Sequence, residues 1–326
     1  MIVRHQQSAP APLLGILCVL AAMIIWSTIP VGTRLLMRDG AFSPAFIAAT
    51  RLGITALLFI ALRAGSARRL GLPFFPSLRR TGWLCIAAAA ICGNLLIYAI
   101  GLRYTTAGAT AVVNPVNAIS TVLLAALLLG ERLTARKLLG MLLAVCGVLL
   151  VVFHGASLTD LLSSRHLLGN LLEILASSIW SLYAIGQTKL QQDTGGRDIL
   201  MPIFVLAALF ALLMLPLTGR PILHTPRMTD WLVLFALGTV CTAAAYWLFA
   251  AGLQRIATSE GAMFNVLVPP CGLLLAHLFL GEPLHANILA GLALVVTGLI
   301  CILWRRGQSP LRRGSGHASK DLRLPT

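Results

Sequence analysis

Two charged residues lie within long apolar stretches of this chain, and their side chains could bind a polar ligand. Arg51 falls in the apolar stretch 44–62, and Glu173 falls in the stretch 167–188. A guanidinium can bind a carboxylate through two parallel hydrogen bonds, whereas a carboxyl group can hold a proton or an amine. We therefore predict that the two residues either pair directly or bind opposite ends of one zwitterionic ligand.

Each of the two residues also has a purely structural interpretation. Glu173 could stay neutral and only join two helices through hydrogen bonds. Arg51 could extend its aliphatic stem until the charged end reaches a polar surface. From the residues alone, both alternatives stay open.

Polar residues recur three or four positions apart in several apolar stretches, a spacing that places them on one face of a helix. A polar face in lipid must point toward protein or water, so several such faces together predict one shared cavity. A single Ser, Thr or Asn more often only links two helices. The residues predicted to line the cavity are Arg51, Asn94, Tyr98, Asn114, Asn117, Glu173, Ser177, Trp180, Ser181, Tyr246 and Asn265.

The stretches that carry these residues have the composition of membrane-spanning segments. The mean hydropathy is +0.89 and only 11% of the residues are charged, whereas a soluble domain has roughly twice that share. Since a helix needs about 20 apolar residues to cross a bilayer, we predict an all-α integral membrane protein with ten transmembrane helices. The ten predicted spans are 13–31, 44–62, 83–102, 105–129, 138–153, 167–188, 199–219, 231–253, 261–281 and 284–303.

The second half of the chain repeats the first. Residues 101–152 align without a gap with residues 252–303, and 18 of these 52 positions are identical. A repeat in such an apolar chain is typical of membrane transporters, in which two repeats surround a central site. The clearest matches are Asn114 with Asn265, Gly130-Glu131 with Gly281-Glu282, and Ile25-Trp26-Ser27 with Ile179-Trp180-Ser181.

The distribution of positive charge predicts how the chain is oriented. Of the 25 Lys and Arg residues, 18 fall in segments on one side of the predicted spans and 6 in loops on the other side. Cytoplasmic segments carry the excess of Lys and Arg, so we expect both termini in the cytoplasm and the chain in the inner (plasma) membrane. Five spans per repeat is an odd number, so the second repeat should be inverted relative to the first. The net charge of +15 then reflects membrane orientation rather than nucleic-acid binding.

The predicted spans and their orientation divide the chain into five segments. They are an N-terminal cytoplasmic tail (1–11), the first repeat (12–155), an external linker (156–165), the second repeat (166–306) and a disordered basic cytoplasmic tail (307–326). The seven Cys lie within apolar stretches, where Cys usually packs as a small apolar residue. No disulfide, metal or cofactor is expected.

Three groups of residues are similar to the motifs of one known family. They are Ile25-Trp26-Ser27, then Ser43-Pro44 followed by Arg51, and Asn114-Pro115 followed by Leu129-Gly130-Glu131-Arg132-Leu133, Gly140 and Gly147. On these motifs, residues 12–305 resemble the EamA-type branch of the drug/metabolite transporter superfamily, which implies ten helices, an inverted repeat and export of amino acids or other small metabolites. Leu209 stands where the second repeat would match Arg51, so any role of that Arg belongs to one repeat.

Two further features predict folding and helix geometry rather than ligand binding. Glu131 and Glu282 occupy matching short turns at the C-terminal ends of spans, where a carboxylate opposes the helix dipole. Their matched positions indicate a role in folding rather than in binding cargo. Pro115, Pro269 and Pro270 lie near the middles of their spans and predict bends there.

These observations favour a secondary transporter that exports a small polar metabolite, most simply an amino acid, as a monomer or homodimer. Its expected partners are the cargo, the lipid bilayer and protons as a candidate coupling ion. Efflux of cationic drugs is the main alternative, since the Trp and Tyr residues favour a cation, and vitamin or nucleoside transport stays open. A membrane-embedded enzyme is disfavoured because the sequence has no H-E-x-x-H motif and no clustered metal ligands. It has no G-x-x-x-x-G-K-[ST] motif that would bind ATP directly.

Overall fold

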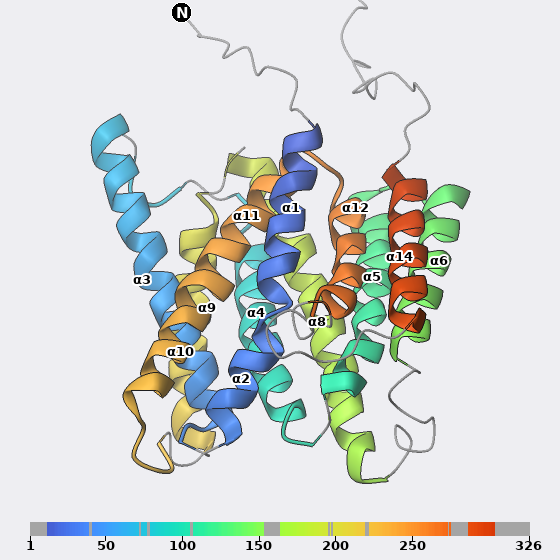
Figure 1. Cartoon of the computed structure of the whole chain (residues 1–326). Coiled ribbons are helices and arrows are strands. Elements are labelled where there is room, and N and C mark those ends of the chain that lie inside the picture. The colour runs from blue at the N-terminus through green and yellow to red at the C-terminus, as the bar shows by residue number, and fades with distance from the viewer. Residues whose placement is uncertain are drawn as a thin grey trace, which may run out of the picture.

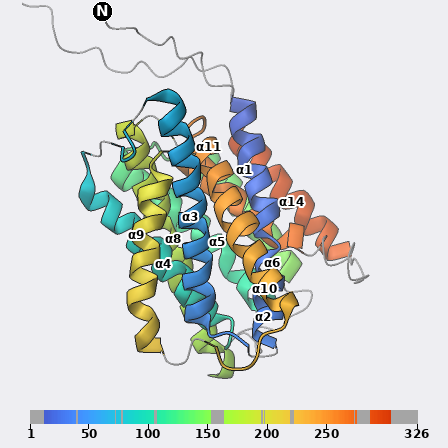
Figure 2. The same ribbon diagram turned by 90° about the vertical axis from the view of Figure 1, so that its left-hand side faces the viewer.

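Nearly all of the described backbone is helical. The helices run roughly side by side as one bundle, and the first turn of α1 and the last turn of α14 lie at the same end of it (Figures 1 and 2). An even number of crossings would place them so. The computed structural model describes residues 12–38, 41–71, 73–76, 79–104, 107–152, 164–194, 196, 198–218, 222–272, 274 and 286–303.

The elements follow the order of the predicted spans. In the first half they are α1 (Pro12–Trp26), α2 (Ile29–Arg38), α3 (Pro44–Leu70), α4 (Thr81–Gly101), α5 (Ala107–Leu129) and α6 (Ala135–Val152). In the second half they are α8 (Ser164–Thr194), α9 (Leu200–Met214), η1 (Leu215–Thr218), α10 (Met228–Gly238), η2 (Thr239–Ala244), α11 (Ala245–Leu253), α12 (Thr258–Met263), η3 (Phe264–Leu267) and α14 (Ala286–Leu303).

Helix is therefore found in each of the ten predicted spans. Five helical segments among the described residues are long and apolar enough to cross a membrane, and three shorter apolar helices accompany them. The all-α architecture is confirmed, while the number of ten crossings stays a prediction. The predicted tails and the linker at 156–165 lie mostly outside the described residues.

Several predicted span boundaries were wrong, each for a local reason. The first span is not one helix, because a turn at Ser27 and Thr28 separates α1 from α2. The second span continues past residue 62 to Leu70, where Gly71 ends the helix in the left-handed conformation at φ 63°. The sixth span continues to Thr194 rather than ending at residue 188. In both long helices the extension carries polar and charged residues, which an apolar pattern cannot detect.

The predicted proline bends are found in one repeat. Pro269 and Pro270 lie one residue after η3, a 3-10 turn that interrupts the ninth span. A proline cannot donate to the carbonyl four residues before it, and the carbonyls concerned belong to Asn265 and Val266 within η3. Pro115, in contrast, lies inside α5, which is one unbroken helix.

Helix contacts come in matching pairs when the two repeats are exchanged. α1 packs against α11 as α8 packs against α4, and α10 packs against α3 as α4 packs against α9. Three further pairs, α3 with α9, α5 with α12 and α6 with α14, each join a helix to its own counterpart. The bundle thus consists of two related helical units packed against each other.

The crossing of α6 and α14 requires glycine. A Cβ added to Gly147 would lie 2.6 Å from the carbonyl oxygen of Gly291, and one added to Gly298 would lie 2.5 Å from that of Gly140. Exchanging the repeats turns one contact into the other, because Gly140 matches Gly291 and Gly147 matches Gly298. Helices in lipid associate through such close packing of small residues.

Gly147→Ala should therefore destabilise the protein. The new methyl group would overlap the Gly291 carbonyl, and we expect a cost of about 1–3 kcal/mol, seen as a lower melting temperature in detergent. Gly53→Ala is the matched control, since a Cβ at Gly53 on α3 meets nothing within 4 Å. Equal melting temperatures for the two variants would contradict the close crossing.

Candidate functional site

Aromatic side chains fill the centre of the bundle, where the two repeats meet. Trp26 on α1 and Trp180 on α8 are repeat equivalents, and their rings contact edge to face with centroids 5.8 Å apart at 89°. The ring of Tyr246 lies 5.0 Å from Trp26, and the Trp180 indole N–H donates to the Tyr246 hydroxyl at 3.3 Å. We call this group the aromatic cluster; its members are Trp26, Trp180, Tyr183, Phe204, Tyr246 and Phe249.

A π-helical segment lies next to the aromatic cluster. η2 spans Thr239–Ala244, and its wider turns leave carbonyl oxygens without their usual α-helical donors. The Trp26 indole N–H donates to the Cys241 carbonyl at 3.1 Å, and the Thr242 hydroxyl donates to the Leu237 carbonyl at 2.7 Å. Such segments occur frequently at functional sites, and this one faces both repeats.

Arg51 is buried against this π-helical segment. Its side chain on α3 is 3% exposed, and its Nε donates to the Thr242 hydroxyl at 3.2 Å. Tyr246, Cys241 and Tyr98 lie close enough to interact with it electrostatically. The guanidinium therefore lies between α3, α4 and the η2–α11 segment, beside the aromatic cluster, and does not extend its stem to a polar surface.

The direct ion pair between Arg51 and Glu173 is absent. The ion pairs seen among the described residues include Arg63–Asp198, Arg80–Asp193 and Lys137–Glu131, and neither Arg51 nor Glu173 takes part in them. Equal depth along two helices does not bring two side chains together, because each helix also has a direction in which it presents them. Arg51 turns toward η2, whereas Glu173 packs between α8 and α4. The second alternative, a zwitterionic ligand held between the two, stays a prediction.

Several other predicted residues form hydrogen bonds between helices. Ser181 on α8 and Thr121 on α5 are fully buried, and their hydroxyl oxygens lie 2.8 Å apart. The Thr121 hydroxyl also lies 3.4 Å from the Asn117 side-chain oxygen. The Asn94 amide on α4 donates to the Ala176 carbonyl on α8 at 2.9 Å. These contacts match the structural interpretation, in which polar residues link helices.

The remaining predicted residues are more scattered. The Asn265 amide donates to the Ala262 carbonyl at 3.0 Å within its own interrupted helix. The carbonyl of Ser177 accepts from the Ser181 hydroxyl at 3.3 Å, so this contact is local to α8. The side chain of Asn114, the repeat partner of Asn265, lies outside the described part of the structure.

Glu131 caps the start of another helix across the repeat boundary. One carboxylate oxygen accepts from the Thr258 backbone N–H at 3.0 Å, and the other contacts both the backbone and the hydroxyl of Ser259. Lys137 adds an ion pair to Glu131 at 3.4 Å and donates to the Ser259 hydroxyl at 2.6 Å. A carboxylate at a helix N-terminus is well placed to satisfy free N–H groups. Glu282 lies outside the described residues.

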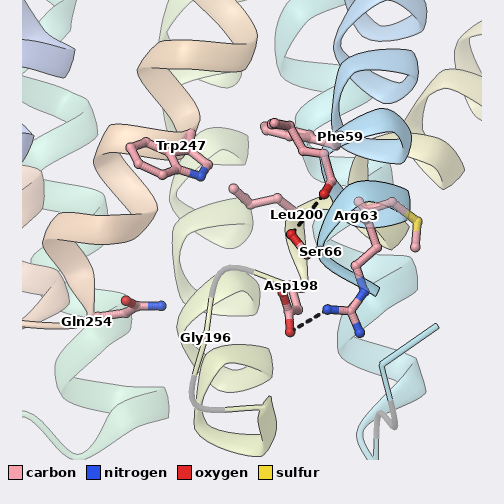
Figure 3. A pocket seen from close by; sticks show the side chains of 10 residues that line it. Phe59, Arg63, Ser66, Gly196, Asp198, Leu200, Trp247 and Gln254 are labelled. Atoms are coloured by element: carbon pink, nitrogen blue, oxygen red, sulfur yellow. Dashed lines mark hydrogen bonds and ion pairs between the residues drawn. The ribbon is translucent and has the colours of Figure 1, made fainter. Parts of the chain in front are cut away.

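A cavity of about 430 Å³ lies between α3, α9 and α11, away from the predicted residues (Figure 3). An ion pair between Arg63 and Asp198, 2.8 Å apart, forms part of its wall. Arg63 also donates to the Pro73 and Phe74 carbonyls, so this guanidinium anchors the loop after α3. The apolar pattern predicts that the second span ends at residue 62 and leaves Arg63 in a loop, so the cavity has no signal in the sequence.

Phe204 and Phe249 were also missed as members of the aromatic cluster. Both are fully or almost fully buried, and both pack on the tyrosine or tryptophan rings. Phenylalanine is common in membrane helices, so its presence in an apolar stretch carries no signal. The internal repeat is the stronger sequence signal for the aromatic cluster, since it places Trp26 and Trp180 at equivalent positions.

The EamA-like transporter family model matches residues 13–153 and 167–304, one match for each repeat. The chain belongs to the EamA-like transporter family. This confirms the resemblance predicted from the motifs and makes the chain a multi-pass membrane protein. A crystal structure of a protein 21% identical in sequence has the same fold, with a TM-score of 0.72 over 89% of this chain and 96% of that one.

Three relatives show how similar proteins are named. An uncharacterized transporter of Clostridium kluyveri is 25% identical over 88% of this chain and 92% of its own. Probable amino-acid metabolite efflux pumps of Salmonella typhimurium and Escherichia coli are 32% and 31% identical. The matched regions cover 59% and 61% of this chain, and 66% and 70% of the two pumps.

Glu131→Gln should lower the amount of folded protein more than the activity of the protein that remains. An amide cannot replace both carboxylate oxygens at the N-terminus of α12, nor pair with Lys137. The measurement is the yield of monodisperse protein by size exclusion, with the exposed neighbour Arg132→Gln as control. Full yield combined with lost transport would instead make Glu131 a gating residue.

Proposed function

We propose that this EamA-like transporter exports a small polar metabolite, an amino acid or a related compound, by alternating access around the aromatic cluster. The observation that carries the proposal is Arg51. Its guanidinium is buried where the two units meet, and none of the ion pairs of the described residues includes it. A buried cation needs a counter-charge, and the carboxylate of a cargo would supply one.

The inverted repeat is part of this proposal. The matching contact pairs and the reciprocal glycine crossing support it, since both are expected of two units related by a two-fold axis. Such an axis in the membrane plane would pass between Trp26 and Trp180, beside Arg51. Rocking of one unit against the other would then open the aromatic cluster to each side in turn.

The cargo class has a chemical basis in the side chains at this centre. A carboxylate would bind Arg51, and an aromatic or aliphatic side chain would pack against Trp26 and Tyr246. The names of the two efflux pumps support amino acids, while the aromatic rings alone would also suit a cationic drug. Arg51 disfavours that second candidate, because a cation would be repelled by the guanidinium.

A counterflow screen in proteoliposomes tests the proposal. Liposomes loaded with unlabelled amino acids, nucleosides or vitamins should take up the matching labelled compound only in the amino-acid set. Arg51→Gln should reduce this uptake at least tenfold, since a charged hydrogen bond of about 1.5–3 kcal/mol is lost. Arg69→Gln, at an exposed position on the same helix, is the control. Uptake of cationic dyes by the wild-type protein, undiminished in Arg51→Gln, would support drug efflux and overturn the proposal.

A further inference from the structure

A carboxyl group is buried in the packing interface between α4 and α8, which we call the α4–α8 seam. Glu173 is 1% exposed, and its Oε1 has no hydrogen-bond partner among the described residues. The space it occupies exists because residue 101 is glycine: a Cβ there would lie 2.8 Å from Oε1. Further along the same seam, Asn94 binds the Ala176 carbonyl, and Gly186 lets Ala87 approach.

The other repeat has the same seam without the acid. α1 packs against α11, and there Val19 packs against Gly252 as Glu173 packs against Gly101. The pairs correspond, since Glu173 follows Val19 by 154 residues and Gly252 follows Gly101 by 151. An apolar side chain therefore suffices for the packing, and the carboxyl group at Glu173 is not needed to close the helices.

The surroundings of Glu173 offer it no cation in the closed seam. It takes part in none of the ion pairs formed by the described residues. α5, which also packs against α8, carries no titratable residue. The titratable residues of the helices and turns around it are Cys85, Cys92, Tyr98, Arg103 and Tyr104 on α4 and its following turn, Arg165, His166, Tyr183, Lys189 and Asp193 on α8, and Glu260 on α12. Of those that can carry a positive charge, Arg103 is exposed, Arg165 and His166 lie about two turns before Glu173, and Lys189 lies at the far end of α8. The Cys, Tyr, Asp and Glu residues cannot supply a positive charge.

We propose that Glu173 is a proton-binding site that controls the α4–α8 seam, so that the seam closes with the carboxylic acid and opens with the carboxylate. An unpaired carboxylate is strongly disfavoured inside a membrane protein, whereas a neutral carboxylic acid is tolerated much better. When the helices separate, water reaches the side chain, the proton passes from the carboxyl oxygen to water, and the charge is hydrated. Closing requires the same proton to return.

This proposal rests on the proposed function for its meaning in transport, because the α4–α8 seam borders the aromatic cluster through Trp180. Glu173 would lie about 10 Å below the expected outer surface, given its position about seven residues into the predicted span. Protonation from that side would then be a condition for closing the cargo site toward the outside.

The first test needs no cargo. Hydrogen exchange of the full-length protein in nanodiscs is measured at mildly acidic and at alkaline pH, after correction for the intrinsic exchange rate. In the wild type, protection of residues 94–104 and 167–180 should fall at alkaline pH by about tenfold per pH unit above the titration point. Glu173→Gln and Glu173→Val should remove this pH dependence. Residues 12–22 and 247–256, in the seam of Val19, are the internal control and should show none in any protein.

The second test uses counterflow of an amino-acid mixture at equal pH on both sides. Wild-type uptake should decline at alkaline pH, whereas whatever uptake Glu173→Gln and Glu173→Val show should no longer depend on pH. Equal pH dependence of exchange in the wild type and in Glu173→Gln, or none in the wild type, overturns the proton site. If no protein shows counterflow, the proposed cargo class fails, and hydrogen exchange alone still decides the role of Glu173.

Discussion

Close backbone contact between helices is the constraint on which this architecture depends. In a bilayer the hydrophobic effect does not hold helices together, so tight packing must do so. Gly147 and Gly298 allow α6 and α14 to cross, Gly15 and Gly252 allow α1 to meet α11, and Gly101 leaves room for the side chain of Glu173. Because Gly147 matches Gly298 and Gly101 matches Gly252, the contacts also set how the repeats face each other. The edge-to-face contact of Trp26 and Trp180 follows from that arrangement.

The charged residues that could bind cargo or a proton lie at positions where the two repeats differ. Arg51 is buried against η2, while Leu209, its counterpart in the alignment, is 51% exposed on α9. Glu173 replaces Val19 in an otherwise matching seam. The residues common to both repeats therefore form the helix packing. The candidate cargo and proton sites depend on single charged residues that one of the repeats lacks. A charge in lipid is retained only where the structure offers it a partner, a ligand or a proton.

The sequence predicted the helices and the repeat better than it predicted the contacts of the candidate site residues. Long apolar stretches, glycines in register and the repeated Glu131 motif identify the helices and the family, because membrane helices must satisfy all backbone groups internally. Helix ends were less predictable, since α3 and α8 continue into polar residues. The pairing of Arg51 with Glu173 could not be judged, because depth along a helix says nothing about the direction of a side chain. The π-helical turn that presents Thr242 to Arg51 has no sequence pattern.

The most direct test of the central site is the fluorescence of single-tryptophan proteins. One protein retains Trp180 in the aromatic cluster, and a second retains Trp247 beside the cavity of Arg63 and Asp198, with the other tryptophans replaced by Phe. Both are titrated with the amino acid that gives the strongest counterflow. The account predicts a saturable change at Trp180 that is lost in Arg51→Gln, and no change at Trp247. A saturable change at Trp247, with Trp180 silent, would contradict it and place the cargo in the cavity between α3, α9 and α11.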